Sequence, residues 1–238
     1  MLQPHEIERA LVVTAHPDDV DFAAAGTVAN LTDAGVSVTY CLVTDGQAGG
    51  HDLAVAREDM ARIRRAEQSV AATHVGVTDL VFLGMMDGSV EYSLDLRRSL
   101  SQVIREVRPT IVISHNTQIN LSSAYASHPD HVATGQGVFA AVYPDSRNPF
   151  AFPDLLTAGF QPWAVDELWV INAEPATDTV DITDQIDRKM AALLSHVSQH
   201  LDPEALRERM VSWFSNNARL GGLPEGRLAE RFTVVNTR

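Results

Sequence analysis

Short apolar runs alternate with longer amphipathic segments over the first 142 residues of the chain. The runs rich in β-branched residues predict strands at Ala10 to Thr14, Val36 to Thr44, Asp79 to Leu83 and Thr110 to Ser114. The segments with helical periodicity between and after them are 22–31, 54–74, 94–107 and 127–142. Strands and helices in regular succession predict an α/β fold, with a mostly parallel sheet and helices on both faces.

A dense polar cluster follows the first predicted strand. The segment from His16 to Asp21 reads His-Pro-Asp-Asp-Val-Asp, with one imidazole and three carboxylates in six residues. The predicted helix that follows places the cluster in a strand-to-helix turn, near the positive end of the helix dipole. Carboxylates stay ionised there, and a metal ion is a natural reason to crowd them against a histidine.

A second segment of the same kind follows the fourth predicted strand. His128-Pro129-Asp130-His131 opens a predicted helix, and its two histidines are three residues apart, on roughly the same side of the first turn. In a doubly wound sheet of order 3-2-1-4-5, strands one and four are neighbours at the usual ligand crevice. The two segments are therefore expected to converge there.

The rest of the chain is less regular. The glycine-rich turn from Asp45 to Asp52 lacks the spacing of known phosphate-binding loops and is interpreted as a loop near the substrate. Pro144 to Pro162 predicts a long surface loop that forms a lid or a subunit contact, so that a homo-oligomer is one expectation. A late strand over 166–172, helices over 182–199 and 203–216, and a short apolar run over 232–235 complete the pattern. We expect one domain over 1–238, with both motifs in 1–142 and a loop and helical part over 143–238.

Composition narrows the class of partner. The formal charge of -13 argues against nucleic acid or an anionic membrane surface as a partner. No apolar run approaches the roughly 20 residues that a membrane span needs, and no signal peptide is recognisable, so a cytoplasmic location is expected. The one cysteine, Cys41, lies in a predicted strand and is expected to be a small buried apolar residue.

The two motifs together predict hydrolytic metal chemistry. A catalytic zinc ion takes three protein ligands and leaves one position for water, whose pKa then falls to about 7. His16, Asp19 and His131 supply such a set. Asp18 then remains as a general base, and His128 remains to stabilise an oxyanion or to protonate a leaving amine. Hydrolysis of an amide or ester suits this division.

These motifs resemble those of the PIG-L/LmbE-like zinc N-deacetylases. The resemblance rests on Ala15 to Asp19, Gly26-Thr27 and His128 to His131, and further on Asp87-Gly88, His196-x-Ser198-Gln199 and Ala229-Glu230-x-Phe232. It implies a Rossmann-like fold and removal of acetyl from an N-acetylglucosamine-type unit. It also implies one Zn²⁺ per chain held by His16, Asp19 and His131, with Asp18 as base and His128 as acid or electrostatic partner; the choice between Asp18 and Asp19 comes from the resemblance alone.

The chain departs from the family pattern at two places. Many members carry Glu directly after the aspartate pair, where this chain has Val20 and then Asp21. Some members place a tyrosine two residues before the first histidine of the second motif, where this chain has Ala126 beside Tyr125. The substrate is therefore less well defined than the chemistry.

Other polar residues are first interpreted as ordinary ones. His196 is expected at a surface or helix end, His115 in a polar loop, and Arg64 and Glu67 on a solvated helix face. Trp163, Trp169 and Trp213 are expected in the core or at an interface rather than on a sugar.

The leading prediction is a mononuclear zinc hydrolase that removes acetyl from an N-acetylated amino sugar or its conjugate. An amidase for a larger N-acyl group on an amino-sugar or thiol conjugate is the close alternative. A two-metal phosphoesterase and a non-catalytic sugar- or nucleotide-binding module are the others.

Overall fold

The computed structural model describes residues 1–121 and 127–238. Its strands are β1 (Arg9–Thr14), β2 (Ser37–Thr44), β3 (Asp79–Met85), β4 (Ile111–His115), β5 (Glu167–Ile171), β6 (Asp178–Asp181) and β7 (Ala229–Asn236). Its α-helices are α1 (Asp19–Ala23), α2 (Ala25–Asp33), α3 (Arg57–His74), α4 (Leu94–Val107), α5 (Pro129–Ala140), α6 (Pro153–Thr157), α7 (Ile186–Leu194) and α8 (Pro203–Leu220). No helix among these residues is long and apolar enough to cross a membrane.

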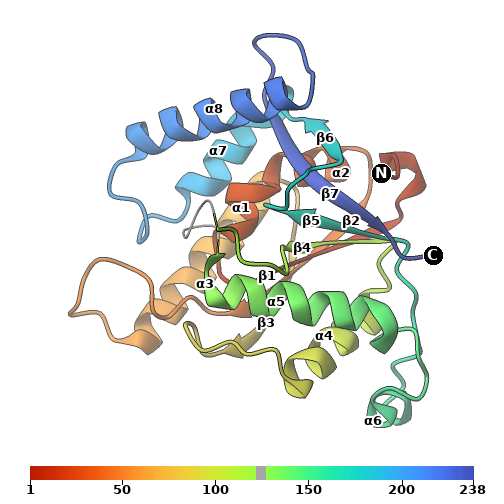
Figure 1. Cartoon of the computed structure of the whole chain (residues 1–238). Coiled ribbons are helices and arrows are strands. Elements are labelled where there is room, and N and C mark those ends of the chain that lie inside the picture. The colour runs from red at the N-terminus through yellow and green to blue at the C-terminus, as the bar shows by residue number, and fades with distance from the viewer. Residues whose placement is uncertain (122–126) are drawn as a thin grey trace.

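Within the described ranges the strands form one sheet, in the order β3-β2-β1-β4-β5-β7-β6 (Figure 1). The first five strands of this order pair in parallel, and β7 pairs antiparallel with both β5 and β6. The expected order 3-2-1-4-5 is therefore confirmed, including the direct pairing of β1 with β4. The winding reverses between these two strands, which is where α/β sheets bind ligands.

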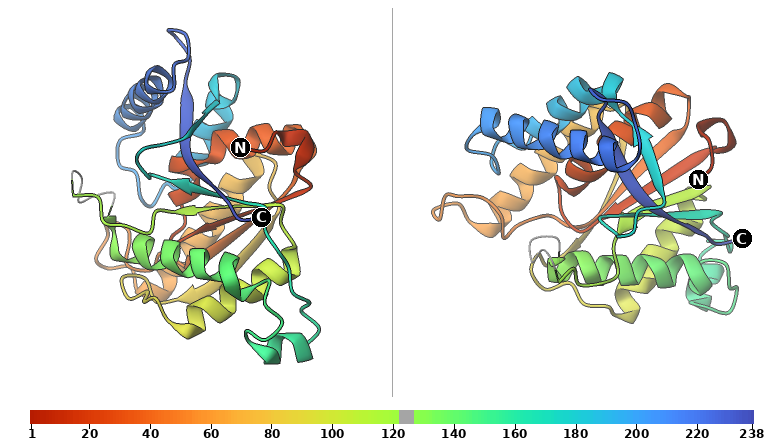
Figure 2. Two further views of the ribbon diagram at one scale, coloured as in Figure 1. Left: turned by 45° about the vertical axis from the view of Figure 1, so that its right-hand side comes forward. Right: turned by 45° about the horizontal axis from the view of Figure 1, so that its top comes forward.

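Alternating side chains of β1 reach two different cores. Ala10 and Val12 pack with residues of α2, α3 and α7, whereas Leu11 and Val13 pack with α4 and α5. Both views of Figure 2 show these helices on opposite faces of the sheet. A strand buried on both faces needs an almost continuous apolar run, and this explains why 10–14 was readable as a strand.

Elements beyond residue 142 depart most from the expectation. The strand expected over 166–172 is β5, and the apolar run over 232–235 is part of β7. Strand β6 was not expected, because Asp178–Asp181 is short, polar and only half-buried. Its conformation comes from pairing with β7. The expected helix over 22–31 is divided at Ala24, whose φ of -142° interrupts the helical path between α1 and α2.

Candidate metal centre and active site

The turn after β1 is held by two side chains of α3. Asp18 has a φ of 87°, a left-handed conformation that is uncommon for a residue other than glycine. Its backbone N–H donates to Oε1 of Gln68 at 2.8 Å. Arg64 donates through Nη2 to Oδ2 of Asp18 at 3.0 Å and to the carbonyl of Pro17 at 2.5 Å. A strained residue persists where its surroundings fix it, and these contacts do so.

The second motif is built as the start of α5. Pro129 occupies the first helical turn, where its missing N–H costs nothing, and His128 is the N-cap residue. Nδ1 of His128 accepts a hydrogen bond from the N–H of Asp130 at 3.2 Å. This contact leaves Nε2 of His128 as the nitrogen available to a ligand.

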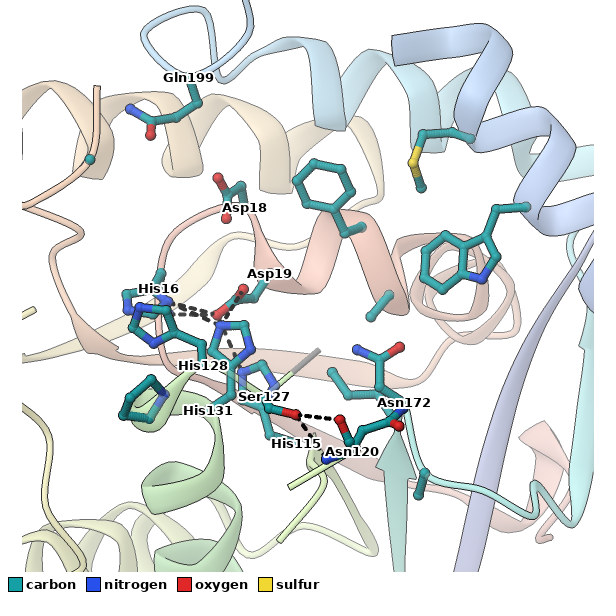
Figure 3. Close-up of a pocket in the computed structure, with 18 of the residues that line it drawn as sticks. His16, Asp18, Asp19, His115, Asn120, Ser127, His128, His131, Asn172 and Gln199 are labelled. Carbon is teal, nitrogen blue, oxygen red and sulfur yellow. Dashed lines mark hydrogen bonds and ion pairs between the residues drawn. The ribbon is translucent and has the colours of Figure 1, made fainter. Parts of the chain in front are cut away.

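Three expected ligand residues meet although they come from two distant turns. Nδ1 of His16 lies 3.2 Å from Nε2 of His131. A carboxylate oxygen of Asp19 lies 3.3 Å from Nδ1 of His16, and the other lies 3.0 Å from Nε2 of His131 (Figure 3). The close pairing of β1 with β4 brings the two turns together.

The spacing of these atoms fits a tetrahedral metal ion. Ligand atoms bonded to zinc at about 2.0–2.1 Å in a tetrahedron lie about 3.3 Å from one another. The 3.2 Å between Nδ1 of His16 and Nε2 of His131 matches that value. Each of these nitrogens also has one of the two Asp19 carboxylate oxygens at 3.0–3.3 Å. His128 also has a ligand atom within 4.8 Å of those of His16 and His131.

Two buried carboxylates that sequence reasoning had given no role hold the other side of His16. Its Nε2 lies 3.1 Å from Oδ1 of Asp87 and 3.2 Å from Oδ2 of Asp130. Burial acts to lower the pKa of His16, but hydrogen bonds to Asp130, Asp19 and Asp87 outweigh it and raise the pKa to about 12. Carboxylates behind a ligating imidazole orient its ring and increase its basicity. In the sequence, the signals that could have identified these carboxylates were the place of Asp130 in the second motif and the place of Asp87 before Gly88.

His115 also belongs to the cluster, so its interpretation as an ordinary polar loop residue was wrong. It is the last residue of β4 and is 4 % exposed. Its Nε2 accepts a hydrogen bond from the N–H of Ala15 at 3.1 Å and lies 3.2 Å from Oδ2 of Asp19. Its ring stacks on that of His131, with centroids 4.2 Å apart. A position one residue past a predicted central strand was the signal for it.

Burial sets the acid–base character of the two expected catalytic groups. Burial raises the pKa of Asp18 to about 6, against the opposing effect of the Arg64 guanidinium. Burial and then the positive charge of His16 lower the pKa of His128. Asp18 is thus ionised and His128 neutral at neutral pH before any cation binds, and a base with a pKa near the working pH is efficient.

A buried network lies behind Asp18. Oδ2 of Asp21 accepts hydrogen bonds from Nε2 of Gln68 at 2.9 Å and pairs with Nε2 of His196 at 2.8 Å. His196 lies two residues beyond the end of α7 and is fully buried, so the expected helix end is confirmed and the expected surface position was wrong. Arg64 is 4 % exposed, and its assignment to a solvated face was wrong for the same reason. One buried side of α3 carries Arg64 and Gln68, a helical turn apart, toward the turn after β1.

The cluster lies in a cavity of 1120 Å³ volume, at the carboxyl ends of the parallel strands. The expected substrate loop contributes Ala48 and Gly49, and the segment after β5 contributes Asn172. Helix α8 contributes Trp213, which is 37 % exposed and therefore not in the core. Tyr125, whose contribution to the site the sequence leaves open, and the neighbouring Ala126 lie outside the described residues.

Fold and site together define an α/β protein with a doubly wound sheet, whose ligand crevice carries a histidine–aspartate cluster suited to a divalent metal ion. The family model described as "PIG-L: GlcNAc-PI de-N-acetylase" matches residues 11–142. The chain belongs to this family.

Individual relatives of the chain are named as deacetylases, in agreement with the family model. The chain is 31 % identical to the diacetylchitobiose deacetylase of Thermococcus kodakarensis, over 82 % of this chain and 71 % of that protein. It is 34 % identical to a probable N-acetyl-α-D-glucosaminyl L-malate deacetylase 2 of Bacillus cereus, over 79 % of this chain and 82 % of that protein. Among solved structures, N,N'-diacetylchitobiose deacetylase from Pyrococcus horikoshii is similar, with a TM-score of 0.90 and 28 % identity over 98 % of this chain and 85 % of that one.

Proposed function

We propose that this protein hydrolyses the acetamide of an N-acetylglucosamine-type unit or conjugate, releasing acetate and a free amine. The observation that carries the proposal is the triangle of His16, Asp19 and His131 ligand atoms, with Asp18 beside it in an open cavity. The relatives named as N-acetylglucosamine-type deacetylases support the choice of substrate.

The triangle would hold one zinc ion through Nδ1 of His16, Nε2 of His131 and the carboxylate of Asp19. A zinc ion at this place would polarise the acetamide carbonyl and lower the pKa of water. Asp87 and Asp130 keep the ring of His16 in the ligating orientation through its other nitrogen.

Asp18 acts as the general base in this proposal. Its ionised carboxylate takes the proton from the attacking water, and its contact with Arg64 fixes the direction of the carboxylate. His128 is the second catalytic group of the proposal. Its neutral Nε2–H donates a hydrogen bond to the developing oxyanion, while its Nδ1 accepts one from the N–H of Asp130. The proton that Asp18 takes from the water passes on to the leaving amine, which balances the hydrolysis.

The test combines metal analysis with a free-amine assay on the purified protein. One zinc ion per chain and acetate release from N-acetylglucosamine conjugates are expected. Asp18→Asn should keep the zinc and lose at least about 100-fold in kcat, the size of effect typical of a general base. Two ions per chain, or phosphoester hydrolysis in place of amide hydrolysis, would contradict the proposal, and faster turnover of longer N-acyl groups would favour the amidase alternative.

A further inference from the structure

A second cavity lies at the end of the parallel sheet opposite the metal centre. Its volume is 440 Å³, and its lining includes Arg9, Arg105, Glu106, Arg108, Gly159 and Phe160. Arg9 is the first residue of β1, and the histidine–aspartate cluster follows the other end of that strand. The six residues of β1 therefore hold the two sites about 20 Å apart, at about 3.3 Å per residue. We refer to this cavity as the arginine pocket.

Arg105, in the last turn of α4, is buried without a paired carboxylate. It is 1 % exposed, and its Nε and Nη2 donate to four backbone carbonyls of the segment 145–151, at 2.9–3.1 Å. Its Nη1 is buried and has no acceptor among the described residues. The carboxylate of Asp145 is occupied by Arg97, with both hydrogen bonds at 2.9 Å. A buried charge without a counterion is costly, so an anion in the pocket would stabilise Arg105.

The other two arginines of the pocket lie beside one indole ring. Cζ of Arg9 is 5.8 Å and Cζ of Arg108 is 6.0 Å from the ring centroid of Trp163. The face of an aromatic ring attracts cations, so Trp163 holds these two like charges near each other. Arg9 also pairs with the exposed carboxylate of Glu8, a contact that water weakens. Arg108 is exposed and forms no ion pair within residues 1–121 and 127–238.

The charge of the arginine pocket is opposite to that of the whole protein. The chain has a formal charge of -13, but three arginines and one glutamate line the pocket, which leaves two positive charges in excess. The carbonyl end of α4 attracts cations and accounts for Arg105 and Arg108 in part. It does not account for Arg9, which comes from β1, or for the buried Nη1 without an acceptor.

The chemistry and size of the pocket suit a phosphate ester. A guanidinium matches the oxygens of a phosphate group with two parallel N–H donors, and such a group carries about two negative charges near neutral pH. The volume of 440 Å³ lies within the range of about 300–1,000 Å³ that is usual for sites of small organic ligands. Inorganic phosphate alone would leave much of this space, including the ring of Phe160, without a contact.

We propose that the arginine pocket binds a small phosphate ester, with the phosphate group among the guanidinium groups of Arg9, Arg105 and Arg108. The carbon-containing part of the ester then lies against Phe160. This site is distinct from the metal centre, and the proposal does not rest on the deacetylase function.

The test is calorimetric titration of the zinc-loaded protein with glucose 6-phosphate, AMP and inorganic phosphate at constant ionic strength. We expect saturable binding of one ester per chain, tighter than that of inorganic phosphate. The two esters distinguish a sugar from a nucleoside as the group that carries the phosphate. Arg108→Gln should weaken ester binding by about 10-fold, the size of one lost hydrogen bond between charged groups. Arg108 is exposed and unpaired, so this variant should fold normally.

Arg62→Gln is the matched control, because it removes the same charge from an exposed arginine of α3 that does not line the pocket. It should leave ester binding unchanged. His131→Ala, which removes a proposed zinc ligand, should leave it unchanged as well. Loss of ester binding in His131→Ala would place the phosphate at the metal centre and overturn the proposal. Equal weakening in Arg62→Gln and Arg108→Gln, inorganic phosphate binding as tightly as the esters, or no saturable binding would also overturn it.

Discussion

Asp18 illustrates how much a single residue depends on its neighbours. It occupies a left-handed conformation, and its N–H, its carboxylate and the preceding carbonyl are all fixed by Gln68 and Arg64 of α3. A general base, the role proposed for Asp18, gains from such constraint, because misplacement by about 1 Å can cost about 100-fold in rate.

Gln68→Leu removes one of these constraints without touching the substrate. The N–H of Asp18 loses its acceptor and Asp21 loses a donor, so the carboxylate of Asp18 becomes less well placed. We expect kcat to fall by about 10-fold or more, with KM and zinc content nearly unchanged. Steady-state kinetics and metal analysis check this, with Gln102→Leu on α4 as the control. An unchanged kcat would show that Gln68 does not position the base.

We expect His16 to lose a proton when a metal ion binds. Its pKa is raised to about 12 in the metal-free protein, against 6.5 when unperturbed. The bound proton therefore stabilises the fold fully below pH 6.5, and this contribution is lost as the pH rises through 12. A zinc ion needs the neutral imidazole, so zinc binding at pH 7.5 should release about one proton from His16. Calorimetric titration in buffers of different ionisation enthalpy measures that number, and a value near zero would contradict the assignment.

At the scale of elements, three segments meet at one buried ion pair. Nζ of Lys189 in α7 lies 2.7 Å from Oε1 of Glu230 in β7, and both residues are almost completely buried. Glu230 also accepts hydrogen bonds from the N–H groups of Gly26 and Thr27 at the start of α2. A carboxylate there satisfies N–H groups that have no partner within the helix and complements its dipole.

Removing one partner of this pair should be costly. Lys189→Met leaves the Glu230 carboxylate buried without its cation, and we expect a loss of about 3–5 kcal/mol in the free energy of unfolding. Glu230→Gln added to Lys189→Met should recover part of that loss, since no charge then remains. Urea unfolding followed by circular dichroism measures both. Arg98→Met, which breaks an exposed pair with Asp154, should change stability little.

At the scale of the whole molecule, the residues of the proposed metal centre come from two halves of the parallel sheet. His16 and Asp19 follow β1, whereas His131 belongs to α5, and the two turns meet only because β1 and β4 are paired. An ion that binds this arrangement and not the unfolded chain must stabilise the fold.

Zinc should therefore raise the melting temperature of the protein. At a free concentration of 100 times Kd it adds about 2.7 kcal/mol to the free energy of unfolding, and a chelator should remove that increment. His131→Ala should lose the dependence on zinc, whereas His5→Ala, at an exposed position, should keep it. Differential scanning fluorimetry with and without chelator provides the measurement. An equal zinc effect in His131→Ala would remove His131 from the ligand set.

The sequence by itself determined the local features of this protein. Strands β1 and β4 are buried on both faces of the sheet, and a strand buried in this way is apolar along its whole length. The apolar runs 10–14 and 110–114 therefore predicted these two strands. His16, Asp18, Asp19, His128 and His131 could be predicted as site residues because each is close in sequence to another member of its motif. The order 3-2-1-4-5 of the parallel strands could also be anticipated, because it is a usual order of doubly wound sheets, whereas the places of β7 and β6 could not.

Only the tertiary structure decided which other polar residues lie beside the two histidine–aspartate motifs. His115, Asp87, Arg64 and His196 are single residues on separate elements, and no local pattern distinguishes them from solvated ones. Strand β6 likewise exists only because β7 pairs with it. Contacts between residues far apart in the chain leave no periodic signal, because a pairing is a property of two segments rather than of either one.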